Sequence, residues 1–182
     1  YPEKAAVNYY GRPISYRRLA GEIERLAGAL AEGGIQKGQR VAVYMQNTPH
    51  YIISFYAVMR ANAVVVPVNP MNNEKELDFI LKDAGASALI TTTDLLPAAE
   101  AVRESAQLKF IIAGRYPDYL PDNPELPVPE PMRKPPACPE SCLEWNALMS
   151  KQTPGPDVTV GADDMCLLPY TSGSTGKPKG CI

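Results

Sequence analysis

The chain has 182 residues, of which 45% are apolar and 21% charged, and its formal net charge is −2. This composition supports the core of one domain or somewhat more, and the small net charge excludes a general electrostatic attraction to nucleic acid. The longest nearly apolar stretch, Tyr51–Met59, is far too short to cross a bilayer. No signal peptide is recognisable, and because the chain starts at Tyr1 without Met we expect an upstream segment.

Helices and strands are expected to alternate over the first 113 residues. Four strands are expected from their short apolar, β-branched runs: Arg40–Met45, Val64–Val68, Ala88–Thr92 and Leu108–Ala113. Four helices are expected from apolar spacing and end signals: one capped by Ser15 and ended by Gly33-Gly34, one capped by Asn47 or Thr48 and running to about Arg60, one opened by an Asn73/Glu76 capping box and stopped by Gly85, and one from Asp94 to Ser105. This order predicts an α/β fold with a mainly parallel sheet and helices on both faces.

The character of the sequence changes at residues 115–140. Nine of the nineteen prolines lie between Pro117 and Pro139, which excludes helix or central strand over most of this stretch. We expect a surface excursion that acts as a plain connector, with a ligand for proline-recognition domains as the alternative. Ser141 and Glu144 then have the spacing of a capping box for a short helix to about Lys151, and the apolar run Met165–Tyr170 is expected to form a strand.

The four cysteines, at positions 138, 142, 166 and 181, show no evident disulfide framework. The three-residue spacing between the first two differs from the two-residue spacing that is usual in zinc sites, and no second ligand pair is nearby. We therefore expect reduced cysteines in a cytoplasmic protein, and no metal site within this chain.

The most informative segment is Tyr170–Gly180, which reads YTSGSTGKPKG. Its glycines allow the backbone to come close to a polyphosphate, and its hydroxyls and lysines add donors and positive charge. It is not a Walker loop, because only two residues, rather than four, separate Gly173 from Gly176, and Lys177 is followed by Pro178. A flexible Gly/Ser linker is the other alternative, but it explains neither the Lys-Pro-Lys-Gly ending nor the apolar run before it.

This segment resembles, without a gap, the phosphate-binding loop of the adenylate-forming superfamily, which comprises acyl-CoA synthetases, firefly-type luciferases and peptide-synthetase adenylation domains. Ile14–Leu19 (ISYRRL) resembles the family's early "(L/I)-(T/S)-Y-x-x-L" helix start, and Met59–Thr91 resembles the block that runs through a "V-P-V-N-P" strand end into a helix. The resemblance covers nearly all of the chain apart from about residues 115–161. Two departures are visible: Asn62 stands where glycine is usual, and Gln39 where aspartate is common.

The resemblance implies that residues 1–182 are the N-terminal part of the large AMP-binding domain. The family's metal-binding glutamate, ribose-binding aspartate and late lysine have no counterpart before Ile182, so we expect the rest of that domain and a small C-terminal domain beyond it. It further implies ATP and Mg²⁺ as cofactors, coenzyme A as co-substrate and a small carboxylic acid as substrate. The nucleotide-binding residues it implies are Thr171, Ser172, Gly173, Ser174, Thr175, Gly176, Lys177 and Lys179, of which Lys179 is the first choice.

The resemblance favours medium- or long-chain fatty-acyl-CoA ligases, through "VPVNPM" followed by "EKELDFILKDAGA". Aryl-CoA ligases, peptide-synthetase adenylation domains and a non-enzymatic phosphate-binding module stay open as alternatives. We expect the 182-residue chain alone to be inactive, and to self-associate through apolar surface left exposed where the strands missing from it should pack. A lipid substrate leaves peripheral membrane association open.

Other conspicuous residues have simpler explanations. His50, the single histidine, has no acid–base partner in view and is expected to be a surface or structural residue. Trp145 and the aromatic set Tyr51, Phe55 and Tyr56 are expected in the core rather than in a base-stacking platform. Asp163 and Asp164 are expected in a solvated turn.

Overall fold

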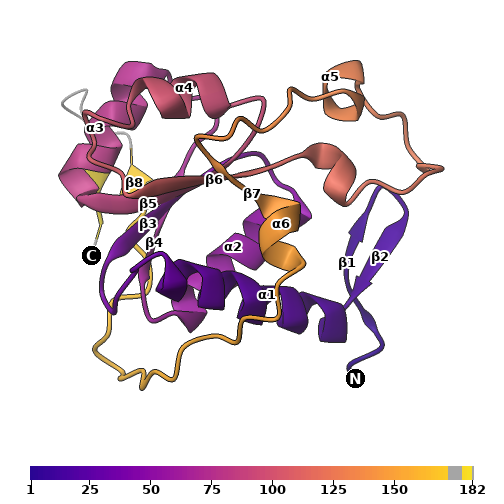
Figure 1. Ribbon diagram of the computed structural model, residues 1–182, viewed down its shortest axis with the longest axis horizontal. Helices are drawn as coiled ribbons and strands as arrows, with labels where there is room; N and C mark the ends of the chain where they lie inside the picture. Colours follow the sequence, from indigo (N-terminus) through magenta and orange to yellow (C-terminus); the bar gives the residue numbers. More distant parts are fainter. Residues whose placement is uncertain (172–177, 182) are drawn as a thin grey trace.

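The computed structural model describes residues 1–171 and 178–181 and is built around a five-stranded sheet (Figure 1). The strand order is β4-β3-β5-β6-β7, and each neighbouring pair is parallel. The strands are β3 (Arg40–Tyr44), β4 (Val64–Val68), β5 (Ala86–Thr92), β6 (Phe110–Gly114) and β7 (Leu143–Glu144). The predicted α/β fold with a mainly parallel sheet is therefore confirmed.

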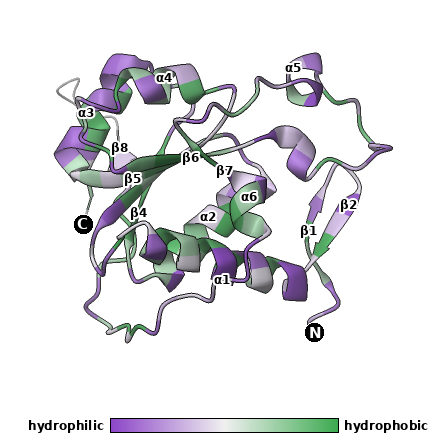
Figure 2. Cartoon of the chain, in the orientation of Figure 1, coloured by the Kyte–Doolittle hydropathy of each residue, from purple (hydrophilic) through white to green (hydrophobic). Residues whose placement is uncertain are grey.

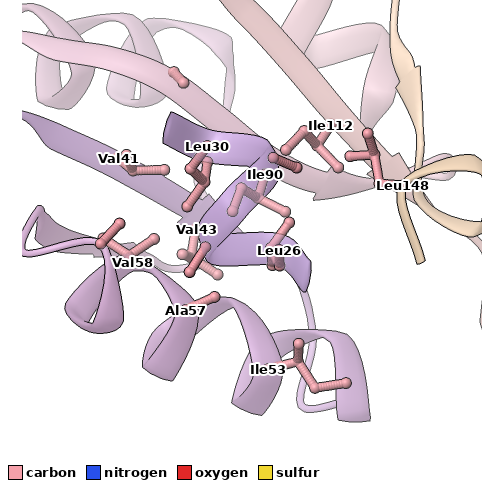
Figure 3. Close-up of a cluster of buried hydrophobic side chains, with 14 of the residues drawn as sticks. Leu26, Leu30, Val41, Val43, Ile53, Ala57, Val58, Ile90, Ile112 and Leu148 are labelled. Atoms are coloured by element: carbon pink, nitrogen blue, oxygen red, sulfur yellow. The ribbon is translucent and has the colours of Figure 1, made fainter. Parts of the chain in front are cut away.

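Helices cover both faces of the sheet, because successive residues of a strand point to opposite sides. Helices α1 (Tyr16–Glu32), α2 (Pro49–Arg60) and α6 (Trp145–Met149) pack on one face, and α3 (Glu74–Ala84) and α4 (Leu96–Ala101) on the other. Val41 and Val43 face the first layer, whereas Ala42 and Tyr44 face the second. The strands between the two helix layers are mostly apolar (Figure 2). Figure 3 shows Leu26, Leu30 and Ile53 packed against the sheet.

Several helix ends form as predicted. The Ser15 side chain accepts from the Arg18 N–H at 3.2 Å, and Asn73 and Glu76 form the reciprocal capping box. Gly85 adopts the left-handed conformation at φ 59°. Asn62 has φ 53°, so it takes the backbone position of the usual glycine, and its Nδ2 donates to the Thr159 carbonyl at 3.1 Å.

Two predicted helices differ in the structure. The helix expected from Asp94 to Ser105 is α4 alone, after which the chain continues in turns, with the Arg103 N–H bonded to the Glu100 carbonyl. The Ser141/Glu144 capping box was wrong: Glu144 belongs to β7, and the Ser141 hydroxyl donates to Glu100 instead. Pairing of Leu143 and Glu144 with β6 takes these residues into the sheet, so α6 begins only at Trp145.

The strand expected at Met165–Tyr170 is also shorter than predicted. Leu167 forms an isolated parallel bridge with Val65, and regular pairing begins only at β8 (Tyr170–Thr171). The reason lies in β4, where the N–H of Val64 bonds toward β3 and that of Val65 bonds outward to Cys166. The next outward position is Pro67, which has no N–H to continue the ladder.

An N-terminal hairpin that was not predicted consists of β1 (Ala5–Tyr9) and β2 (Arg12–Ser15), and its turn places Tyr10 and Gly11 at positive φ. The proline-rich excursion packs against this hairpin: the Glu125 N–H donates to the Tyr10 carbonyl, and Arg12 Nη1 donates to the Leu120 carbonyl. Within the excursion lie two short helices, η1 (Tyr116–Asp118) and α5 (Glu130–Arg133). In the described part of the chain, no helix combines the length and apolar character needed to span a bilayer.

A buried polar cluster ties the excursion to the helix layer. His50 on α2 lies 3.1 Å from Asp118 (Nε2 to Oδ2), and Asn146 Nδ2 donates to the other Asp118 oxygen at 2.7 Å. The Tyr119 hydroxyl donates to Glu22 at 2.7 Å and accepts from Trp145 Nε1 at 3.0 Å. His50 and Trp145 are fully buried, which confirms the structural alternative for His50 and the core position of Trp145.

Burial lowers the pKa of His50, and the hydrogen bond with Asp118 only partly offsets this effect. Burial raises the pKa of the Asp118 carboxyl. The hydrogen bonds from His50 and the Arg115 N–H lower it by more, so the pKa of this carboxyl lies below its usual range. His50 is therefore neutral and donates to a charged Asp118 at neutral pH. Of the other aromatic residues expected in the core, Tyr51 and Phe55 are half-buried, whereas Tyr56 is 51% exposed, which corrects that prediction.

We predict that the free energy of unfolding falls as the pH drops below about 6.5. In this range the histidine of the unfolded chain binds a proton, whereas buried His50, whose pKa is lower, stays neutral. The slope is bounded by one proton, about 1.4 kcal/mol per pH unit. A second loss begins below about 3.9, where unfolded Asp118 is protonated before folded Asp118. Urea unfolding at closely spaced pH values measures both steps.

His50→Gln is the matched variant, because the chain has no other histidine. The variant should be less stable at pH 7.5 and should show almost no slope between pH 7.5 and 5. An equal slope in the variant and the parent would contradict this explanation.

Candidate functional site

The predicted phosphate-binding segment begins and ends in a small antiparallel pair of strands, called here the loop stem: β8 (Tyr170–Thr171) and β9 (Lys179–Gly180). Tyr170 is opposite Gly180, and Thr171 is opposite Lys179. Both Thr171 and Lys179 are exposed. Of the eight predicted site residues the structure therefore places two, and it brings these two together; Ser172, Gly173, Ser174, Thr175, Gly176 and Lys177 lie outside the described residues.

The edge of the main sheet fixes where the stem begins. The Val65 N–H donates to the Cys166 carbonyl at 3.0 Å, and the Leu168 N–H donates to the Val65 carbonyl at 2.8 Å. Because this bridge is parallel, the chain runs from Leu167 in the direction of the carboxyl ends of the strands, which is where open α/β sheets bind ligands. The stem returns beside the same segment, with the Cys181 N–H bonded to the Pro169 carbonyl at 2.9 Å.

Close packing holds the two stem strands together. A Cβ at Gly180 would lie 3.2 Å from Leu168 Cδ1 and 3.3 Å from Tyr170 Cζ, so this position has little room for a side chain. The Tyr170 hydroxyl donates to Asp83 Oδ2 at 2.6 Å. Burial and the Asp83 carboxylate both raise the pKa of Tyr170, so its hydroxyl keeps the proton that it donates.

The donor set of the stem suits a phosphate chain better than a metal ion. Lys179 contributes an ammonium group and Thr171 a hydroxyl, both on exposed positions of adjacent strands, and these are common phosphate ligands. Within residues 1–171 and 178–181, no three His, Cys, Asp or Glu side chains are grouped so that they could hold a metal ion. The described stem residues therefore offer donors of the kind that phosphate groups accept from.

The predicted turn residues near the site do form a turn. Asp164 Oδ2 accepts from the Gly161 N–H at 2.7 Å and from Lys37 Nζ at 2.8 Å. The cysteines are free in the structure: Cys142 is buried, Cys138 is half-buried, and Cys166 and Cys181 are exposed. Burial, followed by the bond to the Glu100 carboxylate, raises the pKa of Cys142 to about 12, so this thiol is protonated and is no nucleophile.

Asp83 contacts the loop stem through Tyr170, and this contact was not predicted from the sequence. It lies 87 positions from Tyr170 along the chain, on a helix whose sequence signals concern only capping and burial. No spacing or motif in the sequence links the two residues, because their contact depends on how α3 packs beside the edge strand.

Known proteins share the sequence pattern of this chain over its whole length. The family model described as "AMP-binding enzyme" matches residues 1–182. A feruloyl-CoA synthase from Amycolatopsis sp is 34% identical over 181 residues, covering 100% of this chain and 30% of that protein. A long-chain-fatty-acid–CoA ligase from Bacillus subtilis (strain 168) is 31% identical over 192 residues, covering 100% of this chain and 34% of the relative. The chain thus spans about a third of the length of these relatives.

Solved structures share the fold. A putative long-chain-fatty-acid CoA ligase from Rhodopseudomonas palustris CGA009 matches 99% of this chain and 40% of its own, with a TM-score of 0.77 and 25% identity. An anthranilate CoA ligase solved in complex with anthranoyl-AMP matches 98% of this chain and 31% of its own, with a TM-score of 0.81 and 24% identity. Since the family model matches the whole chain, the chain belongs to the family of AMP-binding enzymes.

Proposed function

We propose that the protein carrying this chain joins a carboxylic acid to AMP with release of pyrophosphate, and then transfers the acyl group to the thiol of coenzyme A. In this proposal residues 1–182 are the N-terminal part of the AMP-binding large domain, residues 115–140 are its proline-rich excursion, and residues 170–180 bind phosphate. The observation that carries the proposal is the loop stem, which holds Thr171 opposite Lys179 at the two ends of the hydroxyl- and glycine-rich segment.

The chemistry needs groups that hold negative charge. Attack of a carboxylate on the α-phosphorus of ATP breaks the bond to pyrophosphate, and charge then builds on the leaving phosphates. Positioned N–H groups, hydroxyls and a lysine ammonium stabilise that charge most strongly where water is excluded. Thr171 and Lys179, with residues 172–177 between them, would hold the β- and γ-phosphates. Mg²⁺, when bound, neutralises phosphate charge, and its protein ligands would come from outside the described residues.

We propose a medium- or long-chain fatty acid as the substrate. Relatives from Bacillus subtilis and Salmonella typhimurium that are named long-chain-fatty-acid–CoA ligases support this choice. An aromatic acid is the second candidate, because a feruloyl-CoA synthase is at least as similar in sequence. An adenylation domain of a peptide synthetase has weaker support, since surfactin synthase subunit 3 is 26% identical. A non-enzymatic phosphate-binding module built on the same sheet is the alternative from another class.

The four free cysteines support a cytoplasmic location for the protein. Peripheral contact with membranes would follow from a lipid substrate rather than from a membrane-spanning helix.

Acid-dependent exchange of pyrophosphate into ATP tests the proposed reaction directly. The full-length protein that carries this chain should catalyse exchange with fatty acids of eight to eighteen carbons at a rate at least about tenfold above that with ferulate or anthranilate, because a hydrophobic pocket gains with each methylene it buries. The 182-residue chain alone should give background exchange only. Fastest exchange with ferulate would replace the proposed fatty acid by an aromatic acid, and the absence of exchange with every acid tested would favour the binding module.

We also propose that the isolated 182-residue chain self-associates. Tyr16 and Tyr56 are 56% and 51% exposed, and they border one surface hollow on the α1–α2 layer together with Leu19, Ile23 and Ile52. Apolar surface of this kind favours association. Sedimentation velocity should show the mass average rising with concentration.

Tyr56→Ser should reduce that rise, whereas Leu126→Ser, which changes an exposed apolar residue in the proline-rich excursion, should leave it unchanged. A monomer at all concentrations would contradict self-association, and equal effects of the two variants would contradict this surface.

A further inference from the structure

The contact between Tyr170 and Asp83 joins the loop stem to a rigid helix. Asp83 lies in the last turn of α3, and its Oδ2 accepts from the Tyr170 hydroxyl at 2.6 Å. In Figure 1 the yellow strand β8 lies beside α3 near the C-terminus. Helix α3 itself is fixed, because Leu77, Ile80 and Leu81 are buried against the sheet. The hydrogen bond therefore ties β8 to an element that cannot shift without disturbing the core.

The same tyrosine sets the position of β9. Tyr170 pairs with Gly180, and its ring lies so close that a Cβ at Gly180 would be 3.3 Å from Cζ and 3.4 Å from the hydroxyl oxygen. Lys179 is the residue directly before Gly180 and pairs with Thr171. A change in the direction of the Tyr170 side chain would thus move the strand that carries Lys179.

We propose that Asp83 is a positioning residue for nucleotide binding: through its hydrogen bond to Tyr170 it fixes the loop stem, and so holds Lys179 where the phosphates of ATP are bound. The role rests on the proposed function. Asp83 does not touch the nucleotide, and its effect is transmitted through Tyr170 and the β8–β9 pairing.

The position of Asp83 separates this role from a contribution to folding. Asp83 is exposed, and an exposed acid without a special contact contributes little to stability. Asp78, on the same helix, is the matched control: it bonds to Lys82 and Ser105 and has no described contact with β8 or β9. Asp83→Ala and Asp78→Ala each remove one carboxylate and its side-chain hydrogen bonds from the same helix, but only Asp83→Ala removes a bond to the loop stem.

Steady-state pyrophosphate exchange in the full-length protein tests the role. Asp83→Ala and Tyr170→Phe should each raise the KM for ATP about tenfold, the effect of losing a hydrogen bond to a charged group, and should leave the KM for the acid unchanged. Asp83→Asn keeps an oxygen that accepts from Tyr170, so it should restore the KM to within about twofold of the parent. Asp78→Ala should not change it.

A double-variant cycle tests whether the effect passes through Lys179. In a Lys179→Ala background, Asp83→Ala should add no further increase in the KM for ATP, because the group that it positions is gone. Trypsin supplies a readout that is independent of activity: the Lys179–Gly180 bond should be cut faster in Asp83→Ala than in Asp78→Ala.

The outcomes separate this role from the proposed function. Normal exchange in the parent, with Asp83→Ala indistinguishable from Asp78→Ala, would overturn the role of Asp83 alone. Asp83→Asn as damaging as Asp83→Ala, or additive effects of Asp83→Ala and Lys179→Ala, would also overturn it. No acid-dependent exchange in the parent would overturn the proposed function, and this role with it.

Discussion

The bridge between Leu167 and Val65 is the constraint on which the candidate site depends. Two backbone hydrogen bonds attach the chain to the open edge of β4, and Pro67 prevents this pairing from continuing as a regular strand. The chain must therefore leave the sheet within a few residues. It then makes its next pairing with itself, as the β8–β9 stem. A short attachment followed by a stem holds Thr171 and Lys179, which flank the hydroxyl- and glycine-rich segment, near the sheet edge.

The opposite edge of the sheet is secured by different physics. There β7 pairs with β6, and the buried cluster of His50, Asp118, Tyr119 and Trp145 locks the proline-rich excursion to α2 and α6. In this mostly buried cluster His50 Nε2, both Asp118 carboxylate oxygens, the Tyr119 hydroxyl and Trp145 Nε1 have hydrogen-bond partners, and such pairing offsets the cost of burying polar groups. The β7 edge is thus covered by a cluster of buried, hydrogen-bonded side chains whose stability depends on pH. Among the described residues, the β4 edge is bound by only two backbone hydrogen bonds, beyond which the donors of the loop stem are exposed. The exposed donors of the loop stem, Thr171 and Lys179, lie at the β4 edge, where we propose that phosphate binds.

Most of the fold could be predicted, because local signals and global packing agree. The buried β-branched runs are enough to predict the strands. The Asn73/Glu76 capping box predicts where α3 begins, and Gly85 predicts where it ends. The errors arise where a partner distant in sequence overrides a local signal. Glu144 pairs with β6 in the sheet instead of capping a helix, and Pro67 lacks the N–H that would extend the strand expected at Met165–Tyr170. For the site, the motif predicted Thr171 and Lys179 but not Asp83, whose contact with Tyr170 exists only after α3 has packed.

Contact between Lys179 and the phosphates of ATP is the central proposal, and the reactivity of the Lys179 amine tests it directly. Full-length protein treated with a limiting acetylating reagent, with and without MgATP, can be analysed by mass spectrometry at Lys179 and at Lys151, an exposed reference lysine. MgATP should slow acetylation of Lys179 severalfold and leave the rate at Lys151 unchanged, since an amine that hydrogen-bonds to phosphate is shielded from the reagent. Equal rates at Lys179 with and without MgATP, under conditions where the nucleotide is bound, would contradict the account.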